Sequence, residues 1–134
     1  MRAVLDPNVL ISAAISSAGA PAAVVRRWLD GEFEVVSSEM LLDELTRALA
    51  YPKLRKRLSG VDAAEYVALV RRESLIRPDP AEPPSIASSD ADDNYLIALA
   101  ESTRSILVSG DGHLLALADR LPIHSPASFL ELLD

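Results

Sequence analysis

Two aspartates follow short apolar stretches of the chain. Asp6 comes directly after Arg2–Leu5, and Asp111 comes three residues after Ile106–Val108. Short apolar runs of this kind are typical of buried strands in a parallel sheet. Because ligands of such sheets bind beyond the carboxyl ends of the strands, we expect both carboxylates at one edge of the sheet. Each also fits a simpler role, Asp6 as a helix N-cap and Asp111 as a turn residue.

A glutamate interrupts an apolar helical pattern near the middle of the chain. Glu44 has Met40, Leu41 and Ala48 among its neighbours three and four residues away. A carboxylate on a buried face is costly unless it is paired or binds a cation, which makes Glu44 a candidate ligand. The alternative is a position at the rim of a narrow apolar face.

Asp93 stands in a similar context. The residues three, four and seven positions after it are apolar, so its carboxylate shares a helix face with core residues. It also lies in the first turn of the expected helix, where a capping role stays open. We interpret Asp90 and Asp92 as helix-start acids that cap free N–H groups and favour the helix dipole.

Four carboxylates in one pocket would repel one another unless a divalent cation neutralised them. The chain has no cysteine and two histidines, and neither histidine has ligand spacing with the other. Ligands that are all oxygen favour Mg²⁺ or Mn²⁺ over zinc. These cations bind phosphate oxygens and activate water, so phosphodiester hydrolysis is the chemistry that we expect.

The elements that must position these acids alternate along the chain. With 134 residues and 49% hydrophobic residues, we expect one domain over 1–134 with a packed core. The pattern predicts strands over 2–5, 33–36, 75–77, 106–108 and 122–124. It predicts helices over 7–14, 21–29, 39–50, 63–73, 92–101, 114–118 and 127–133. A short basic helix is expected between Pro52 and about Leu58, and a proline-rich loop over 78–90. This order predicts an α/β fold, with helices on both faces of a mainly parallel sheet.

As a set, these stretches resemble the PIN-domain ribonucleases found as toxin components of bacterial and archaeal toxin–antitoxin pairs. The resemblance is carried by residues 4–12, 38–45, 90–100, 107–111 and 125–130, and it covers essentially the whole chain. It implies a three-layer α/β/α sandwich with a central sheet of four or five strands. It also implies endoribonuclease activity that leaves 5′-phosphate and 3′-hydroxyl ends.

The resemblance assigns roles to individual residues. The family's acidic quartet corresponds to Asp6, Glu44, Asp93 and Asp111, which would hold Mg²⁺ or Mn²⁺. Supporting polar positions correspond to Asn8 and Ser109, and Asp92 could substitute for its neighbour.

Two positions depart from the family's pattern. Pro7 replaces the usual Thr or Ser, which removes a hydroxyl and an N–H beside the first aspartate. His113 stands where some members carry a further acid, which puts a second, weaker metal site in doubt.

A basic cluster follows Glu44 in the sequence and comprises Arg47, Lys53, Arg55, Lys56 and Arg57. It is interpreted either as a surface that follows RNA phosphates or as a solvated helical face. Asp43 is expected to be a surface acid, and its spacing allows it to pair with Arg47. The chain as a whole carries a formal charge of −7, which argues against a broad electrostatic nucleic-acid binder. The resemblance further implies an antitoxin partner and a homodimer.

Other classes are less well supported by the residues. No run of ~18 apolar residues predicts a membrane helix, and the N-terminus is not typical of a signal peptide, so we expect a cytoplasmic protein. A metal-dependent phosphatase of the aspartyl-phosphate type would need an aspartate at Asn8. A catalytically silent module that binds RNA or protein is the other alternative. The aromatic residues Trp28, Phe33 and Phe129 are expected in the core or at a subunit interface rather than as base-stacking platforms.

Overall fold

The protein folds around a five-stranded sheet in which every neighbouring pair is parallel. The computed structural model describes residues 1–134. The strand order is β3-β2-β1-β4-β5. The strands are β1 (Arg2–Leu5), β2 (Glu34–Ser37), β3 (Leu75–Ile76), β4 (Ile106–Val108) and β5 (Ile123–His124).

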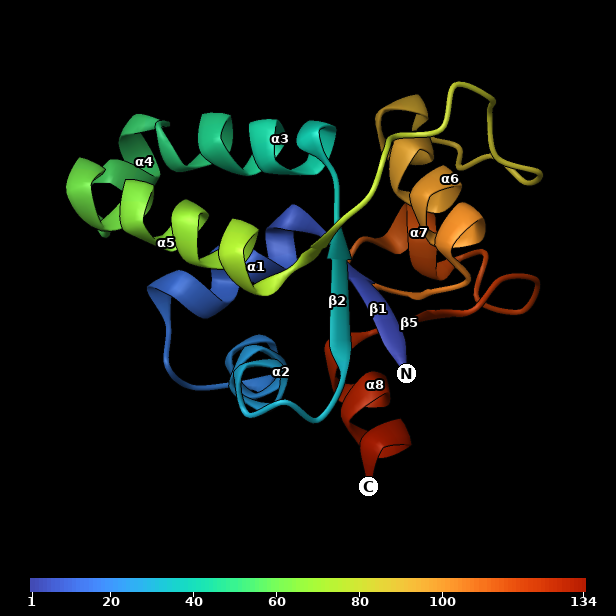
Figure 1. Cartoon of the computed structure of the whole chain (residues 1–134), viewed down its shortest axis with the longest axis horizontal. Coiled ribbons are helices and arrows are strands. Elements are labelled where there is room, and N and C mark those ends of the chain that lie inside the picture. Colours follow the sequence, from blue (N-terminus) through green and yellow to red (C-terminus); the bar gives the residue numbers. More distant parts are fainter.

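Eight α-helices and one short 3₁₀ helix connect and flank these strands. They are α1 (Pro7–Ile15), α2 (Ala20–Leu29), α3 (Glu39–Leu49), α4 (Pro52–Arg55), α5 (Gly60–Glu73), η1 (Ala91–Asp93), α6 (Asn94–Thr103), α7 (Gly112–Leu115) and α8 (Pro126–Leu133). Helices α1 to α5 gather on one side of the sheet, whereas α6 and α7 lie on the other (Figure 1). The predicted α/β/α sandwich is confirmed, and the sheet is wholly parallel.

The register of the central strands explains why distant acids meet. In β1 and β4, Ala3 pairs with Ile106 and Leu5 pairs with Val108, so both strands end at the same level. The next residue after Leu5 is Asp6, whose backbone N–H donates to the carbonyl of Val108 at 3.0 Å. Helix α3 begins at this same edge, where the arrowhead of β2 points (Figure 1).

The core lies between the sheet and the apolar faces of the helices. On α3 the buried residues are Leu41, Leu42, Leu45 and Leu49. Phe33 and Phe129 meet edge to face, with ring centroids 4.9 Å apart. Both phenylalanines are buried, and so is Trp28, which confirms that these rings are packed inside the molecule.

Local capping moves two helix starts from their predicted places. Helix α5 begins at Gly60, three residues before its predicted start, because Ser59 is its N-cap; the Ser59 hydroxyl accepts from the N–H of Asp62 at 3.1 Å. Helix α7 begins at Gly112 because Asp111 caps it. No single helix has the length and apolar composition needed to cross a membrane, and only the pair α1 and α2, bent by 96°, meets that test together.

Candidate active site

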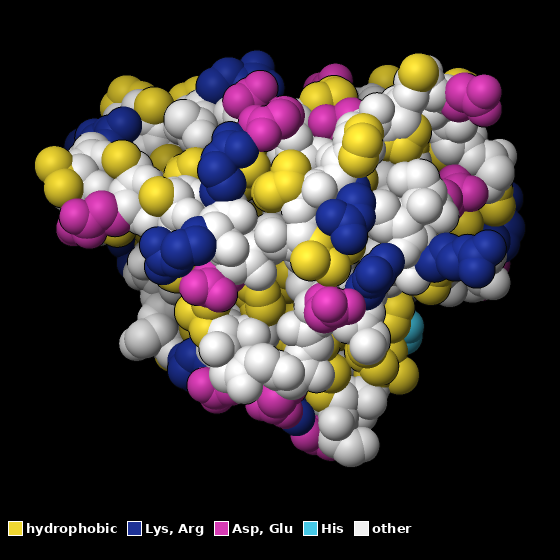
Figure 2. All heavy atoms as spheres, in the orientation of Figure 1, with side chains coloured by type: hydrophobic (Ala, Val, Ile, Leu, Met, Phe, Trp, Pro, Cys, Tyr) yellow, Lys and Arg dark blue, Asp and Glu magenta, His cyan; other side chains and the backbone are white.

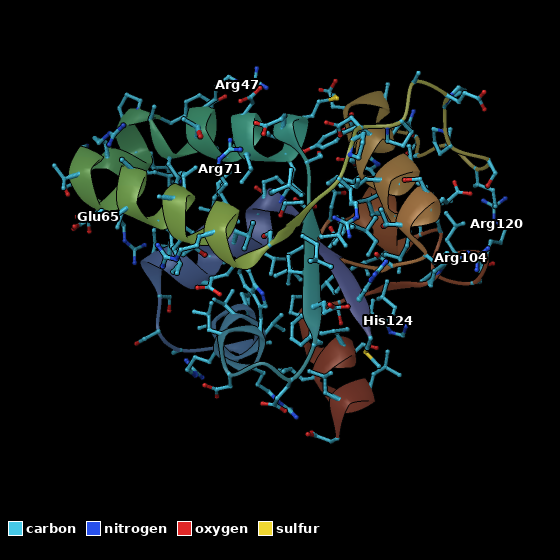
Figure 3. The ribbon with its side chains drawn as sticks, viewed as in Figure 1. Arg47, Glu65, Arg71, Arg104, Arg120 and His124 are labelled. Atoms are coloured by element: carbon cyan, nitrogen blue, oxygen red, sulfur yellow. The ribbon has the colours of Figure 1, made fainter.

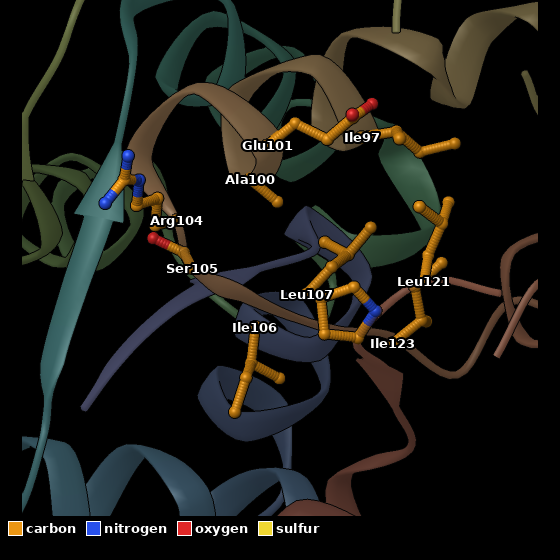
Figure 4. Close-up of a pocket in the computed structure, with 10 residues that line it drawn as sticks. Ile97, Ala100, Glu101, Arg104, Ser105, Ile106, Leu107, Leu121 and Ile123 are labelled. Atoms are coloured by element: carbon orange, nitrogen blue, oxygen red, sulfur yellow. The ribbon is translucent and has the colours of Figure 1, made fainter. Parts of the chain in front are cut away.

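Two cavities of the protein differ in their chemistry. One, of about 420 Å³, lies beside the beginnings of β4 and β5 and is lined mainly by apolar residues such as Ile97, Leu107 and Leu121 (Figure 4). Its one carboxylate, Glu101, already accepts from the backbone N–H and hydroxyl of Ser85 at 3.0 and 2.6 Å. The predicted acids lie at the opposite end of the strands, where ligands of parallel sheets bind.

Asp6 is the most deeply buried acid of this edge, with 4% of its surface exposed. It is the N-cap of α1: Oδ1 accepts from the N–H of Asn8 at 2.9 Å, and Oδ2 accepts from the hydroxyl of Ser109 at 2.7 Å. The cap of Asp6 therefore uses the N–H of Asn8 and does not need the N–H that Pro7 lacks. Burial raises the pKa of Asp6 although both hydrogen bonds oppose it, and the charge of Asp111 adds to the rise.

Asp111 is tied to Asp6 through one buried serine. The Ser109 hydroxyl, which donates to Asp6, accepts from the backbone N–H of Asp111 at 3.0 Å. Oδ1 of Asp111 accepts from the N–H of His113 at 2.7 Å and so caps α7. The capping roles considered for Asp6 and Asp111 are therefore real, and they hold both carboxylates in place at the sheet edge.

Asp93 lies half-buried in η1, directly before α6. It makes no side-chain cap hydrogen bond, and its Oδ2 is buried without a hydrogen-bond partner. Burial, followed by the charges of Asp111, Asp90 and Asp6, raises its pKa to about 7. An orphaned carboxylate oxygen among like charges is costly, which indicates that this position suits a cation.

Glu44 lies at the rim of the buried face of α3, not on the core-facing stripe itself. Its neighbour Met40 is 48% exposed, because the buried stripe runs through Leu41 and Leu45 instead. The carboxylate of Glu44 accepts a hydrogen bond from the hydroxyl of Tyr95 on α6. Burial raises the pKa of Tyr95, and the charges of Glu44 and Asp6 act in the same direction, so the two acids share one neighbourhood.

Two residues at this site were missed by sequence reasoning. Tyr95 stands two positions after Asp93, where its hydroxyl could have marked it as a partner for an acid. Asp79 lies in the proline-rich loop, where no periodicity points to it. Its Oδ2 accepts from the N–H of Met40 at 3.1 Å at the start of α3, and its Oδ1 is buried without a partner.

Hydrogen bonds between residues close in sequence order the loop that carries Asp93. Asp90 caps η1 as predicted, because its Oδ1 accepts from the N–H of Asp92 at 3.0 Å. The Asn94 side chain accepts from the N–H of Ser88 at 2.8 Å. Asp92 is exposed and lines the second cavity.

This second cavity, of about 630 Å³, opens between α3, η1 and the first turn of α1. It is lined by Asn8, Met40, Asp43, Glu44, Arg47, Ala48, Tyr51, Ala91, Asp92 and Tyr95. Two predicted supporting residues, Asn8 and Asp92, thus face the same space as Glu44. The cavity is lined by acidic, basic and apolar side chains. Its volume is sufficient for part of a polar ligand to enter.

The predicted basic cluster divides in the structure. Asp43 is exposed as predicted, but it does not form the ion pair with Arg47 that the spacing allows. On the same helix, Glu39 pairs with Arg71 of α5 at 2.6 Å. Arg47 projects from α3 beside the second cavity (Figure 3). The guanidinium of Arg57 donates to the carbonyl of Ile15 at 3.0 Å, which gives it a structural contact.

The cluster has three further cations, which lie on α4 or directly after it: Lys53, Arg55 and Lys56. All three are exposed, and none takes part in an ion pair. On the face shown in Figure 2, cationic and acidic side chains are interspersed. No broad positive surface is present there, in keeping with the net charge of −7.

The donor set at the sheet edge suits a hard cation. No group of three or more His, Asp or Glu side chains is arranged to hold a metal ion. Mg²⁺, however, usually keeps several waters and is bound through one or two carboxylates, so it does not need a protein cage. The orphaned Oδ2 of Asp93, close to the charges of Asp6 and Asp111, fits such a site.

Comparison with known proteins agrees with the fold. A family model described as "PIN domain" matches residues 2–113. This chain belongs to the PIN-domain family. The family is typically one of nucleases, and its members typically bind Mg²⁺ or Mn²⁺.

The similarity to known proteins covers nearly the full length of this PIN domain. The uncharacterized protein MJ1680 of Methanocaldococcus jannaschii is 26% identical over 98% of this chain and 90% of its own. The crystal structure of PAE2754 from Pyrobaculum aerophilum is similar with a TM-score of 0.61 and 17% identity, over 99% of this chain and 89% of the other.

VapBC2 from Rickettsia felis, solved bound to a DNA fragment from its promoter, is similar with a TM-score of 0.60 and 14% identity, over 93% of this chain and 98% of the other. These two solved structures establish the shared fold.

Proposed function

We propose that this PIN domain is a Mg²⁺- or Mn²⁺-dependent endoribonuclease that hydrolyses phosphodiester bonds. The observation that carries the proposal is the convergence of Asp6, Asp93 and Asp111 at one sheet edge, with an orphaned oxygen on Asp93. Four of the twenty acids in the chain are assigned to this site, including Glu44. A purely structural role does not explain why an aspartate stands at position 93, because burying a carboxylate oxygen without a hydrogen-bond partner destabilises the folded protein.

Each acid has its own role in this proposal. Asp6, Asp93 and Asp111 would hold the divalent cation, partly through water. When bound, the cation supplies positive charge to the phosphate and makes a water molecule more acidic. Glu44 orients the attacking water by accepting a hydrogen bond from it, and Tyr95 holds the Glu44 carboxylate in place. Ser109 keeps Asp6 and Asp111 at a constant separation.

We also propose that the protein is the toxin of a toxin–antitoxin pair and forms a homodimer. The likeness to the Rickettsia VapBC2 structure supports an antitoxin partner. Co-purification of the chain with the product of the neighbouring gene, followed by inhibition of RNA cleavage, tests the partner. Light scattering of the purified chain tests the dimer.

RNA cleavage by the purified protein tests the nuclease proposal directly. We expect cleavage of single-stranded RNA with Mg²⁺ or Mn²⁺, none with EDTA, and 5′-phosphate ends on the products. Asp93→Asn should abolish cleavage, whereas Glu65→Gln should not, because Glu65 is exposed on α5 away from the site (Figure 3). RNA binding without cleavage by the metal-loaded protein would favour the silent binding module instead.

A further inference from the structure

One aromatic side chain differs from all others in this protein. The chain has one tryptophan, three tyrosines and two phenylalanines. Tyr51 is 62% exposed, and its hydroxyl makes no hydrogen bond within the protein. The other five rings are buried or bonded through their hydroxyl groups: Trp28, Phe33, Tyr66, Tyr95 and Phe129. An exposed ring among so few aromatics is a candidate contact for a ligand.

The backbone around Tyr51 is fixed although its side chain is free. Its N–H donates to the carbonyl of Ala48 at 3.2 Å at the end of α3. Its own carbonyl accepts from the N–H groups of Leu54 and Arg55 at 3.0 and 2.9 Å at the start of α4. The backbone at the junction of the two helices is therefore already ordered, so ligand binding would have to order only the side chain of Tyr51.

Tyr51 lines the same cavity as Glu44, two helical turns farther along the chain. Met40, which is 48% exposed, and Ala48 lie with it on the apolar part of the cavity wall. Arg47 lies between Glu44 and Tyr51 in the sequence and takes part in no ion pair. Along this part of the chain, the wall thus offers the acid Glu44, then a cation without an ion-pair partner, and then an exposed aromatic ring.

A nucleotide matches this order of groups. Its base has a flat face for an aromatic ring, and its phosphate has charge for a guanidinium. An apolar peptide would leave Arg47 buried without a partner, and this is costly. In a duplex both faces of each base are already stacked, so only an unpaired base can use the ring of Tyr51.

We infer that Tyr51 is the stacking platform for an unpaired RNA base close to the cleavage position, and that Arg47 contacts the adjoining phosphate. The inference rests on the proposed ribonuclease function and adds a structural reason for preferring single strands. Binding depends on the ring of Tyr51, and the hydroxyl contributes little because it has no partner in the protein.

Kinetics and binding of three variants test this inference. Tyr51→Ala should raise KM for single-stranded RNA about tenfold and leave kcat within about twofold, as expected for loss of one stacked base. Tyr51→Phe should behave as the wild type. Leu29→Ala is the matched control, since Leu29 is 44% exposed on α2, away from the cavity. The thermal midpoint should be unchanged in all three.

A second measurement separates this inference from the nuclease proposal. A short RNA with 2-aminopurine at successive positions reports stacking through fluorescence quenching, in EDTA or with Mg²⁺, whether or not cleavage occurs. Quenching that is lost in Tyr51→Ala and kept in Tyr51→Phe supports the inference even if no cleavage is found. Cleavage with an unchanged KM and unchanged quenching in Tyr51→Ala overturns it and leaves the nuclease proposal standing. Weaker dimerisation or inhibitor binding in Tyr51→Ala, with unchanged RNA binding, also overturns it.

Discussion

The hydroxyl of Tyr95 on α6 donates a hydrogen bond to the carboxylate of Glu44 on α3, across 51 positions of sequence. The two helices lie on opposite sides of the sheet and approach each other at its carboxyl edge (Figure 1). This bond links the helix that follows Asp93 to the helix that carries the proposed water-orienting acid. It makes Tyr95 a positioning residue for Glu44.

Tyr95→Phe should lower kcat about tenfold or more and leave KM nearly unchanged, because a hydrogen bond to a charged group is worth about 1.5–3 kcal/mol. Steady-state cleavage of a labelled RNA measures the two constants. Tyr66→Phe is the matched control: its hydroxyl donates to the carbonyl of Leu10 at 2.7 Å, so this change should cost stability and spare kcat. Equal losses of kcat in both variants would contradict the role of Tyr95.

The metal-free protein should lose stability as the pH rises. The pKa of Asp93 is raised from 3.8 to about 7 by burial and by nearby carboxylates, so between these values the folded protein binds more protons than the unfolded chain. The free energy of unfolding therefore falls with increasing pH across this window. The raised pKa of Asp6 acts in the same direction.

Thermal unfolding in EDTA across this pH range measures the effect. Asp93→Asn should flatten the curve, and Mg²⁺ or Mn²⁺ above pH 7 should raise the midpoint of the wild type only. Since a bound cation stabilises the folded state by mass action, the shift should grow with metal concentration. A flat wild-type curve, or an equal metal shift in Asp93→Asn, would argue against a cation at this edge.

Ser109→Ala should lower both stability and activity. The Ser109 side chain is fully buried and joins Asp6 to the backbone of Asp111. Its loss leaves a buried carboxylate oxygen without a donor, which costs about 1–3 kcal/mol. Ser105→Ala is the control at the other end of β4, where the hydroxyl bonds only to Thr103. Denaturant unfolding and cleavage assays should show stability loss in both variants and activity loss in Ser109→Ala alone.

Lys53→Gln combined with Lys56→Gln should weaken RNA binding and reduce its dependence on salt. Each phosphate contact to single-stranded nucleic acid contributes about 0.7 to the slope of log affinity against log salt, so the double variant should lose up to about 1.4. Arg120→Gln, on the far side of the molecule (Figure 3), should leave the slope unchanged. An unaltered slope in the double variant would indicate that α4 is a solvated helical face.

Much of the fold and part of the site could be predicted from the sequence, because the patterns that indicate them involve residues close together in the chain. Apolar runs followed by acids predict strands that end at Asp6 and Asp111, and backbone hydrogen bonding within a parallel sheet brings such ends together. Capping residues such as Ser38 act within one turn and can be recognised from sequence. Periodicity likewise placed Asp93 on a face shared with buried Leu96 and Ile97.

The contacts and burial of the acids could be learned only from the tertiary structure. The sequence left open whether Glu44 faces the core or the rim of the apolar face, and it allowed a pair of Asp43 with Arg47. The packing of α3 against the sheet and α5 placed Glu44 at the rim and joined Glu39 to Arg71. The bond from Tyr95 and the position of Asp79 are likewise contacts between distant segments. Sequence determines local hydrogen bonding and burial periodicity, whereas such contacts depend on how whole elements pack, which no short pattern encodes.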